Sequence, residues 1–148
     1  MKANILQAHL DVAARYAELS QARRLKVGVV VVKDDRIISI GYNGTPSGWD
    51  NNCEDEIHYP DSQAVTLKTK PEVIHAEENA IAKLARSHES GDGASMFITH
   101  APCAQCAKLI LVSGIKNVYY RDVYRDDAGI KFLQQGGVHI EKIEKDGD

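Results

Sequence analysis

The first third of the chain combines a helical pattern with two strand-like runs. Apolar residues recur at helical spacing over residues 3–19, which predicts an amphipathic helix. The continuous β-branched run at residues 27–32 is typical of a strand that is buried on both faces. Residues 36–40 form a second apolar run, and the polar pair Asp34-Asp35 between the two runs predicts a β-hairpin.

Helices and strands alternate in the second half of the chain. The pattern predicts helices over residues 75–88, 103–113 and 126–135, and strands over residues 94–99, 117–121 and 138–143. A hairpin followed by alternating strands and helices favours an α/β sandwich with a mixed sheet of five strands. A length of 148 residues suits one domain, which we expect to span residues 1–148.

A long polar segment separates the two halves. Residues 41–48 are rich in glycine and proline and predict a turn, and the polar sequence continues without apolar periodicity to about residue 72. We therefore expect an irregular loop over residues 41–72. Loops of this length inside a compact domain tend to be functional or mobile.

Composition and charge narrow the function classes. Hydrophobic residues make up 43% of the chain, charged residues 26%, and the formal net charge is −3. Binding a long nucleic acid usually needs a basic face, so this charge argues against such a partner. No segment approaches the roughly 20 apolar residues that span a bilayer, and the first residues lack a signal-peptide core. We expect no membrane association and a cytoplasmic protein, in the host cytoplasm if the chain is viral.

Two short motifs combine residue types that bind zinc. One is His75-Ala76-Glu77, and the other contains Pro102, Cys103 and Cys106; each opens a predicted helix. Two thiolates and one imidazole make a three-ligand zinc site with a fourth position for water, which is the arrangement of catalytic zinc sites. Glu77 is then expected to carry protons between that water and a substrate, and not to bind the metal.

Each motif alone has a plainer interpretation. A C-x-x-C pair is equally typical of a structural zinc knuckle or a redox pair. A knuckle needs a second pair of ligands, however, and the one remaining cysteine is Cys53 in the polar segment. Both motifs together, each at a predicted helix start, favour a catalytic site. The combination H-x-E…P-C-x-x-C is a known signature of zinc deaminases.

With these motifs the sequence resembles the cytidine deaminase superfamily, and within it the deoxycytidylate (dCMP) deaminases of phages and bacteria. The resemblance extends from about residue 26 to residue 143. It rests on five segments, namely residues 27–30, 41–48, 52–54, 75–81 and 102–106. It implies a cytidine-deaminase-like three-layer α/β/α sandwich, and hydrolytic deamination of dCMP to dUMP and ammonia.

The resemblance also implies roles for individual residues. One zinc ion per chain would be held by His75, Cys103 and Cys106, with Glu77 as the catalytic proton carrier. Some phage relatives hold a second, structural zinc, but Ala22 here replaces one of its cysteines, and Cys53 and His58 lack partners. Cys53 is then expected to be a small, partly buried loop residue. The expected substrate-binding positions are the side chains of Asn43 and Thr45, the backbone of Ala76 and Ala101, and the rings of Tyr120 and Tyr124.

Regulation and assembly are implied in the same way. Members of this family are commonly homohexamers that dCTP activates and dTTP inhibits, with Mg²⁺ carried on the triphosphate. The expected effector-binding residues are Gly41, Tyr42, Asn43, Gly44 and Arg86. Candidate grips for the substrate phosphate are Arg86, Arg121 and Arg125.

Other functions on the same scaffold stay open. A tRNA adenosine deaminase would need a basic and aromatic surface for a stem-loop, which the net charge does not favour. A free cytidine deaminase would need no phosphate grip. A non-catalytic zinc-binding module is a third alternative, of a different class.

Overall fold

The computed structural model describes residues 1–123 and 126–146. Four helices and seven strands are found in these ranges. Their order is α1 (Ala3–Ala17), β1 (Gly28–Lys33), β2 (Arg36–Tyr42), β3 (Glu54–His58), β4 (Val65–Thr69), α2 (Ala76–Ala85), β5 (Ser95–His100), α3 (Ala104–Val112), β6 (Asn117–Asp122), α4 (Ala128–Gln135) and β7 (His139–Lys142).

The main sheet has five strands in the order β2-β1-β5-β6-β7. β1 pairs antiparallel with both β2 and β5, whereas β6 pairs parallel with both β5 and β7. The β1–β2 turn places Asp34 and Asp35 at φ of 52° and 60°, the left-handed region that short hairpin turns need. The predicted hairpin and the mixed five-stranded sheet are confirmed.

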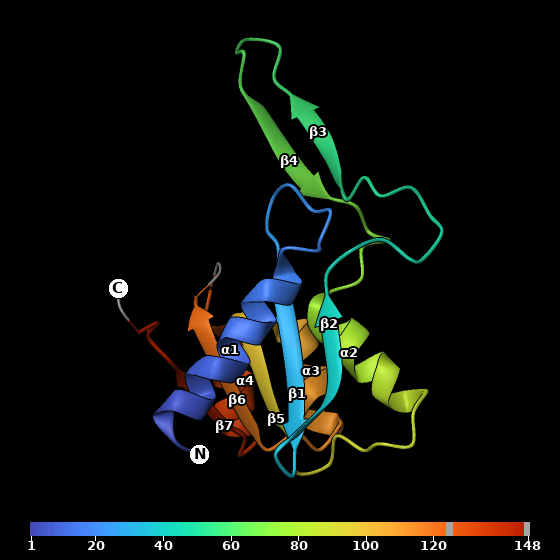
Figure 1. Cartoon of the computed structure of the whole chain (residues 1–148). Coiled ribbons are helices and arrows are strands. Elements are labelled where there is room, and N and C mark those ends of the chain that lie inside the picture. The colour runs from blue at the N-terminus through green and yellow to red at the C-terminus, as the bar shows by residue number, and fades with distance from the viewer. Residues whose placement is uncertain (124–125, 147–148) are drawn as a thin grey trace.

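Helices cover both faces of this sheet, as Figure 1 shows. On one face α1 packs through Leu6 and Leu10 against Val30 and Phe97. On the other face α2, α3 and α4 pack against the alternate strand residues, such as Val29, Val31 and Met96. The β-branched run of β1 is therefore buried on both sides, and the predicted three-layer α/β/α architecture is confirmed.

The prediction of an irregular loop over residues 41–72 is wrong for the middle of that segment, which forms two strands. β3 and β4 form a separate two-stranded antiparallel sheet, which extends away from the main sheet in Figure 1. Most of its side chains are exposed on both faces of the hairpin. Neither face is buried, and alternation of apolar and polar residues is limited to the few positions of β4, so the sequence pattern did not reveal the hairpin.

Two smaller findings complete the fold. α2 ends at Ala85, three residues before the predicted end at residue 88. No helix in residues 1–123 and 126–146 has the length and apolar character needed to cross a bilayer.

Candidate metal centre and active site

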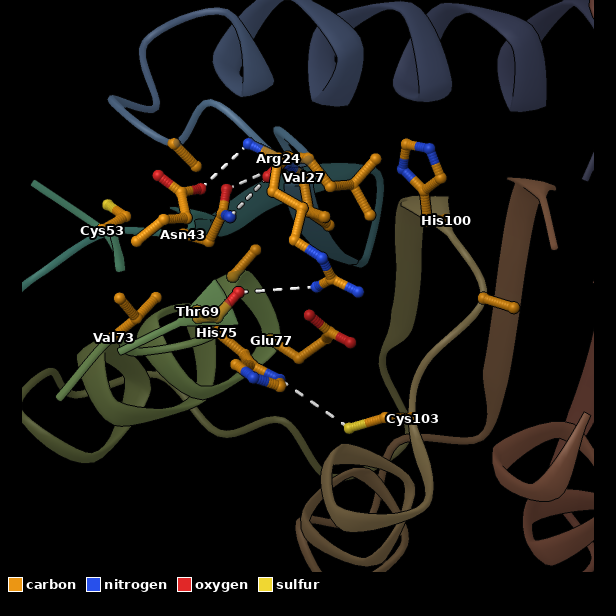
Figure 2. Close-up of a pocket in the computed structure, with 15 residues that line it drawn as sticks. Arg24, Val27, Asn43, Cys53, Thr69, Val73, His75, Glu77, His100 and Cys103 are labelled. Atoms are coloured by element: carbon orange, nitrogen blue, oxygen red, sulfur yellow. Dashed lines mark hydrogen bonds between the residues drawn. The ribbon is translucent and has the colours of Figure 1, made fainter. Parts of the chain in front are cut away.

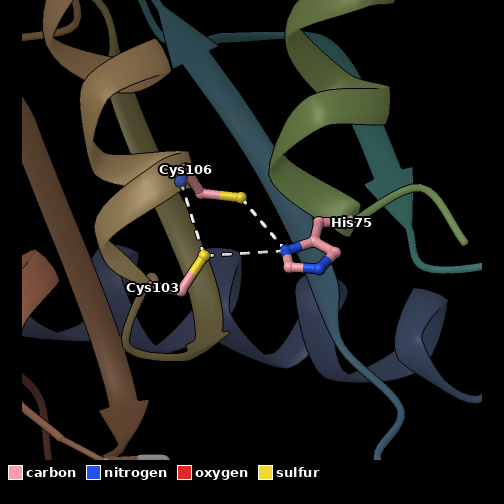
Figure 3. Close-up of side chains that lie close together, drawn as sticks. All are labelled: His75, Cys103 and Cys106. Atoms are coloured by element: carbon pink, nitrogen blue, oxygen red, sulfur yellow. Dashed lines mark hydrogen bonds between the residues drawn. The ribbon is translucent and has the colours of Figure 1, made fainter. Parts of the chain in front are cut away.

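The two zinc-type motifs lie at the beginnings of neighbouring helices. His75 is the N-cap of α2, and its N–H donates to the Glu78 carboxylate at 2.8 Å. Cys103 is the N-cap of α3, and its Sγ accepts a hydrogen bond from the Cys106 N–H at 3.4 Å. Both motifs therefore open helices, as predicted, and the two helix N-termini meet at one place (Figure 3).

These helix starts bring three metal-type donor atoms together. His75 Nδ1 lies 3.2 Å from Cys106 Sγ and 3.7 Å from Cys103 Sγ. The three donor atoms all lie within 4.8 Å of one another, and this is the metal-type cluster found in the described residues. One imidazole and two thiols suit zinc, and with three protein ligands a tetrahedral ion keeps one position open. The residues present fit a catalytic zinc ion.

Hydrogen bonds among the three groups shift their pKa values. Hydrogen bonds with Cys106 and then with His75 lower the pKa of Cys103 to about 4. A hydrogen bond with Cys103 raises the pKa of His75 to about 9. The pKa of Cys106 is also raised, first by its hydrogen bond with Cys103 and then by burial. Metal ligation needs thiolates and a neutral imidazole, so binding of an ion would release protons here.

Glu77 lies in the first turn of α2, beside this cluster. Glu77 is buried, with 5% of the residue exposed. Burial raises the pKa of Glu77 to about 7. Figure 2 shows its carboxyl in the space bordered by His75 and Cys103. A carboxyl with this pKa can both accept and donate a proton near neutral pH.

A small pocket opens beside the cluster, with a volume of about 100 Å³. It lies where the chain segments before β1, after β2, at the base of the β3–β4 hairpin and at the starts of α2 and α3 meet (Figure 2). Its lining residues are Ala22, Arg24, Leu25, Val27, Asn43, Cys53, Glu54, Thr69, Val73, His75, Ala76, Glu77, His100, Ala101 and Cys103.

Three of the predicted substrate positions line this pocket, namely Asn43, Ala76 and Ala101. The Asn43 side chain already holds neighbouring backbone: its Oδ1 accepts from the Val27 N–H at 2.9 Å, and its Nδ2 donates to the Leu25 carbonyl at 2.8 Å. The Ala101 N–H donates to the Asp122 carbonyl at 2.8 Å. Because the Ala101 N–H is engaged in this way, the carbonyl of Ala101 is the backbone group that could contact a ligand.

Other predicted substrate residues lie elsewhere. Thr45 donates through Oγ1 to the Asp50 carbonyl at 2.8 Å and lines a second hollow, not this pocket. Tyr120 is buried in β6 and is not among the residues that line the pocket. Tyr124 lies outside the described residues.

The second hollow contains part of the predicted effector set. It has a volume of about 440 Å³, and Tyr42, Asn43 and Gly44 line it. Gly41 does not line it. A Cβ at this position would lie 2.3 Å from the Ala76 carbonyl oxygen, so glycine is needed here for the close packing of α2 on β2. Arg86 is exposed at the C-terminal end of α2 and is not among the residues that line this hollow.

Of the arginines expected to grip phosphate, those described lie outside the pocket. Arg121 pairs with Asp11 of α1 at 2.7 Å, and Arg125 is not among the described residues. The cation that lines the pocket is Arg24, which sequence reasoning missed. Arg24 lies in an irregular segment between α1 and β1, where no motif marks it.

Sequence reasoning also underestimated how deeply the residues at the start of β3 are buried. Cys53 is 1% exposed and lines the pocket, so it is fully and not partly buried. Glu54 is also 1% exposed and lines the pocket. The pair Cys53-Glu54 belongs to one of the segments that carry the resemblance, and that was the available signal.

Comparison with known proteins agrees with this geometry. A family model described as the cytidine and deoxycytidylate deaminase zinc-binding region matches residues 3–122. The structure of the dCMP deaminase from cyanophage S-TIM5, in complex with dCMP and dUMP, superposes with a TM-score of 0.86 at 45% identity, covering 96% of this chain and 98% of that one.

Curated relatives point the same way. Deoxycytidylate deaminase of Enterobacteria phage T4 is 34% identical, over 92% of this chain and 88% of its own length. ComE operon protein 2 of Bacillus subtilis is 40% identical over 86% of this chain, which spans 65% of that relative's length. The resemblance inferred from the motifs is confirmed, and the chain belongs to the cytidine and deoxycytidylate deaminase family.

Proposed function

We propose that this protein catalyses the hydrolytic deamination of dCMP to dUMP and ammonia. The observation that supports this most directly is the buried Glu77 carboxyl beside a His/Cys/Cys cluster, in one pocket. The family membership supports a zinc deaminase. The phage relatives named dCMP deaminases support the choice of substrate.

The metal ligands in this proposal are His75 Nδ1, Cys103 Sγ and Cys106 Sγ, with one zinc ion per chain. A zinc ion held there would act as a Lewis acid and would lower the pKa of water bound to it to about 7. Cys103 is the N-cap of α3 and Cys106 lies in its first turn, so the positive end of that helix dipole favours the thiolate form of both.

Glu77 moves the protons in this proposal. Its carboxylate would accept a proton from the attacking water and deliver it to the ring nitrogen of the pyrimidine. The water oxygen would bond to the ring carbon that bears the amino group, which leaves a hydroxyl on that carbon. Glu77 would then move the proton of this hydroxyl to the amino nitrogen, and the C–N bond would break as the carbonyl forms, so that ammonia leaves. The pKa of about 7 that burial gives Glu77 suits both directions of transfer at neutral pH.

The pocket suits one ring with a charged substituent. Its volume of about 100 Å³ is below the roughly 300–1,000 Å³ of sites that enclose drug-sized ligands, so the pyrimidine ring would fill it and the rest of the nucleotide would lie at its mouth. Arg24, whose guanidinium faces the same space as Glu77 in Figure 2, is the cation that we assign to the substrate phosphate.

Regulation and assembly are part of the proposal on family grounds. We infer a homohexamer that dCTP with Mg²⁺ activates and dTTP inhibits. The hollow lined by Tyr42, Asn43 and Gly44 supports a second nucleotide site. Free thiols at Cys53, Cys103 and Cys106 suit a reducing compartment such as the cytoplasm.

A substrate panel tests the function. The purified protein is incubated separately with dCMP, dCTP, deoxycytidine, cytidine and tRNA, with and without a zinc chelator, and the products are separated by chromatography. We expect dUMP from dCMP, at a rate that the chelator abolishes. Conversion of tRNA alone, or of the nucleosides in preference to dCMP, would refute the substrate assignment. Absence of any turnover would favour a zinc-binding module.

A further inference from the structure

A fully buried acid stands at the base of the β3–β4 hairpin. Glu54 is 1% exposed, and Glu54 Oε2 accepts hydrogen bonds from the backbone N–H groups of Arg23 at 3.0 Å and Arg24 at 2.9 Å. Its Oε1 lies 3.2 Å from the Arg23 N and 3.7 Å from the Arg23 Nε. Burying a carboxylate is costly unless it is paired and hydrogen-bonded. The carboxylate of Glu54 therefore holds two consecutive backbone N–H groups, those of Arg23 and Arg24, and its ion-pair partner is the Arg23 side chain.

A residue of β4, the opposite strand of the hairpin, contacts the side chain of Arg24. The guanidinium donates through NH1 to Thr69 Oγ1 at 3.4 Å, and Thr69 is the register partner of Glu54 across β3 and β4. One pair of facing hairpin residues therefore contacts Arg24 at its backbone and at its side chain. Figure 2 shows the contact between Arg24 and Thr69 beside Glu77 in the pocket.

We propose that Glu54 is a positioning residue that fixes Arg24 for recognition of the substrate's phosphate group. This inference rests on the proposed function. Glu54 lines the pocket, but its two oxygens already accept from the backbone N–H groups of Arg23 and Arg24 and pair with the Arg23 side chain. In this proposal it therefore acts through the backbone of Arg24 and not by contact with the substrate. The hairpin base thereby sets the preference for a nucleotide over a nucleoside, although the chemistry occurs at the ends of α2 and α3.

Removing the carboxylate tests this role. In Glu54→Ala two N–H groups lose a charged acceptor, and hydrogen bonds to charged groups contribute enough that we expect KM for dCMP to rise about 10- to 100-fold. The kcat should stay within about threefold, because Glu77 and the metal ligands are not contacted. Glu54→Gln keeps one acceptor oxygen and should recover most of the affinity. KM for deoxycytidine, which has no phosphate, should not change.

A matched control and a double-mutant cycle separate positioning from general stability. Asp55→Ala removes the neighbouring acid, which is exposed and pairs with Lys70 at 3.0 Å, and should leave KM unchanged. In an Arg24→Ala background, Glu54→Ala should add no further increase in KM, because its effect passes through Arg24. Melting temperature and zinc content are measured for every variant.

Binding of the product gives a readout without turnover. Calorimetry should show a weaker Kd for dUMP in Glu54→Ala and an unchanged Kd for deoxyuridine. If the parent protein binds dUMP but does not deaminate dCMP, the proposed function fails, and this comparison still decides the role of Glu54. Equal losses for the ligands with and without phosphate, additive effects with Arg24→Ala, or no change at all would each overturn the inference. Should Glu54→Ala fail to fold, Glu54→Gln and Thr69→Val must raise KM for dCMP alone, and otherwise the inference is wrong.

Discussion

At the scale of single residues, the site depends on donor atoms that lie within hydrogen-bonding range of one another before any ion binds. His75 Nδ1 is 3.2 Å from Cys106 Sγ and 3.7 Å from Cys103 Sγ. Such a cluster is preorganised for a soft cation. A substitution of serine for one cysteine replaces a soft sulfur donor by a hard oxygen donor and changes the shape of the site little.

Cys103→Ser tests the donor set directly. The hydroxyl is a poor zinc ligand at neutral pH, so we expect zinc affinity to fall by more than the roughly 10- to 100-fold that loss of an outer hydrogen bond causes. Metal analysis after dialysis gives the zinc content. Cys53→Ser is the matched control, since Cys53 is buried outside the cluster, and it should keep its zinc. Full zinc retention in Cys103→Ser would show that the ion binds elsewhere.

The residues of the site differ in how far the sequence could predict them. The metal-type ligands and Glu77 were predictable because a fixed spacing at a helix start is a local property. Arg24 and Glu54 were not, because their contact joins residues 30 positions apart, in an irregular segment and a polar strand. Sequence periodicity contains no information about such a contact.

At the scale of elements, close packing against β2 positions the first turn of α2. A Cβ on Gly41 of β2 would lie 2.3 Å from the Ala76 carbonyl and 2.8 Å from the Ala80 nitrogen, both in α2. The first turn of α2, which carries His75 at its N-cap, is therefore held against β2 by the absence of a side chain.

Gly41→Ala is expected to displace that first turn. Overpacking of this kind costs about 1–3 kcal/mol of unfolding free energy, and the shift of His75 should also weaken zinc binding. Urea unfolding and a zinc titration measure the two effects. Gly44→Ala is the control, because a Cβ there meets no atom within 4 Å, and its stability should be unchanged. Equal behaviour of the two variants would mean that the packing of α2 on β2 does not position the ligand.

The elements themselves were predictable wherever one face is buried. The β-branched run of β1 and the apolar stripe of α1 both pack into the core, and both were predicted from their patterns. The β3–β4 hairpin was missed because its side chains are mostly exposed and acidic or polar, as at Asp55 and Glu56. Cross-strand pairing defines such a hairpin, and where neither face is buried it leaves only a weak periodic signal, such as the short alternation in β4.

At the scale of the whole molecule, the metal-type cluster joins distant parts of the chain. His75 opens α2, which precedes β5 in the chain, and Cys103 opens α3, which follows it. Both helices pack into one core cluster. An ion that binds the folded state alone stabilises it by mass action, by about 4 kcal/mol when its concentration is a thousand times its Kd.

Removal of zinc should therefore destabilise the entire fold. For a chain of this size we expect the melting temperature to fall by roughly 10 °C on chelation and to return when zinc is added. Magnesium should not restore it, because hard cations prefer oxygen ligands. Calorimetry with each ion measures the effect. A melting temperature that is insensitive to chelator would contradict a zinc site built from both helices.

The most direct test of the central claim is turnover and zinc content measured on the same sample of Glu77→Gln. If Glu77 carries protons beside a zinc ion held by His75, Cys103 and Cys106, the variant keeps its zinc and loses dCMP turnover by about 10²- to 10⁴-fold. Glu89→Gln, which removes the half-exposed ion-pair partner of Arg36, should match the parent protein in both measurements. Loss of the zinc in Glu77→Gln, or turnover within tenfold of the parent, would contradict the account.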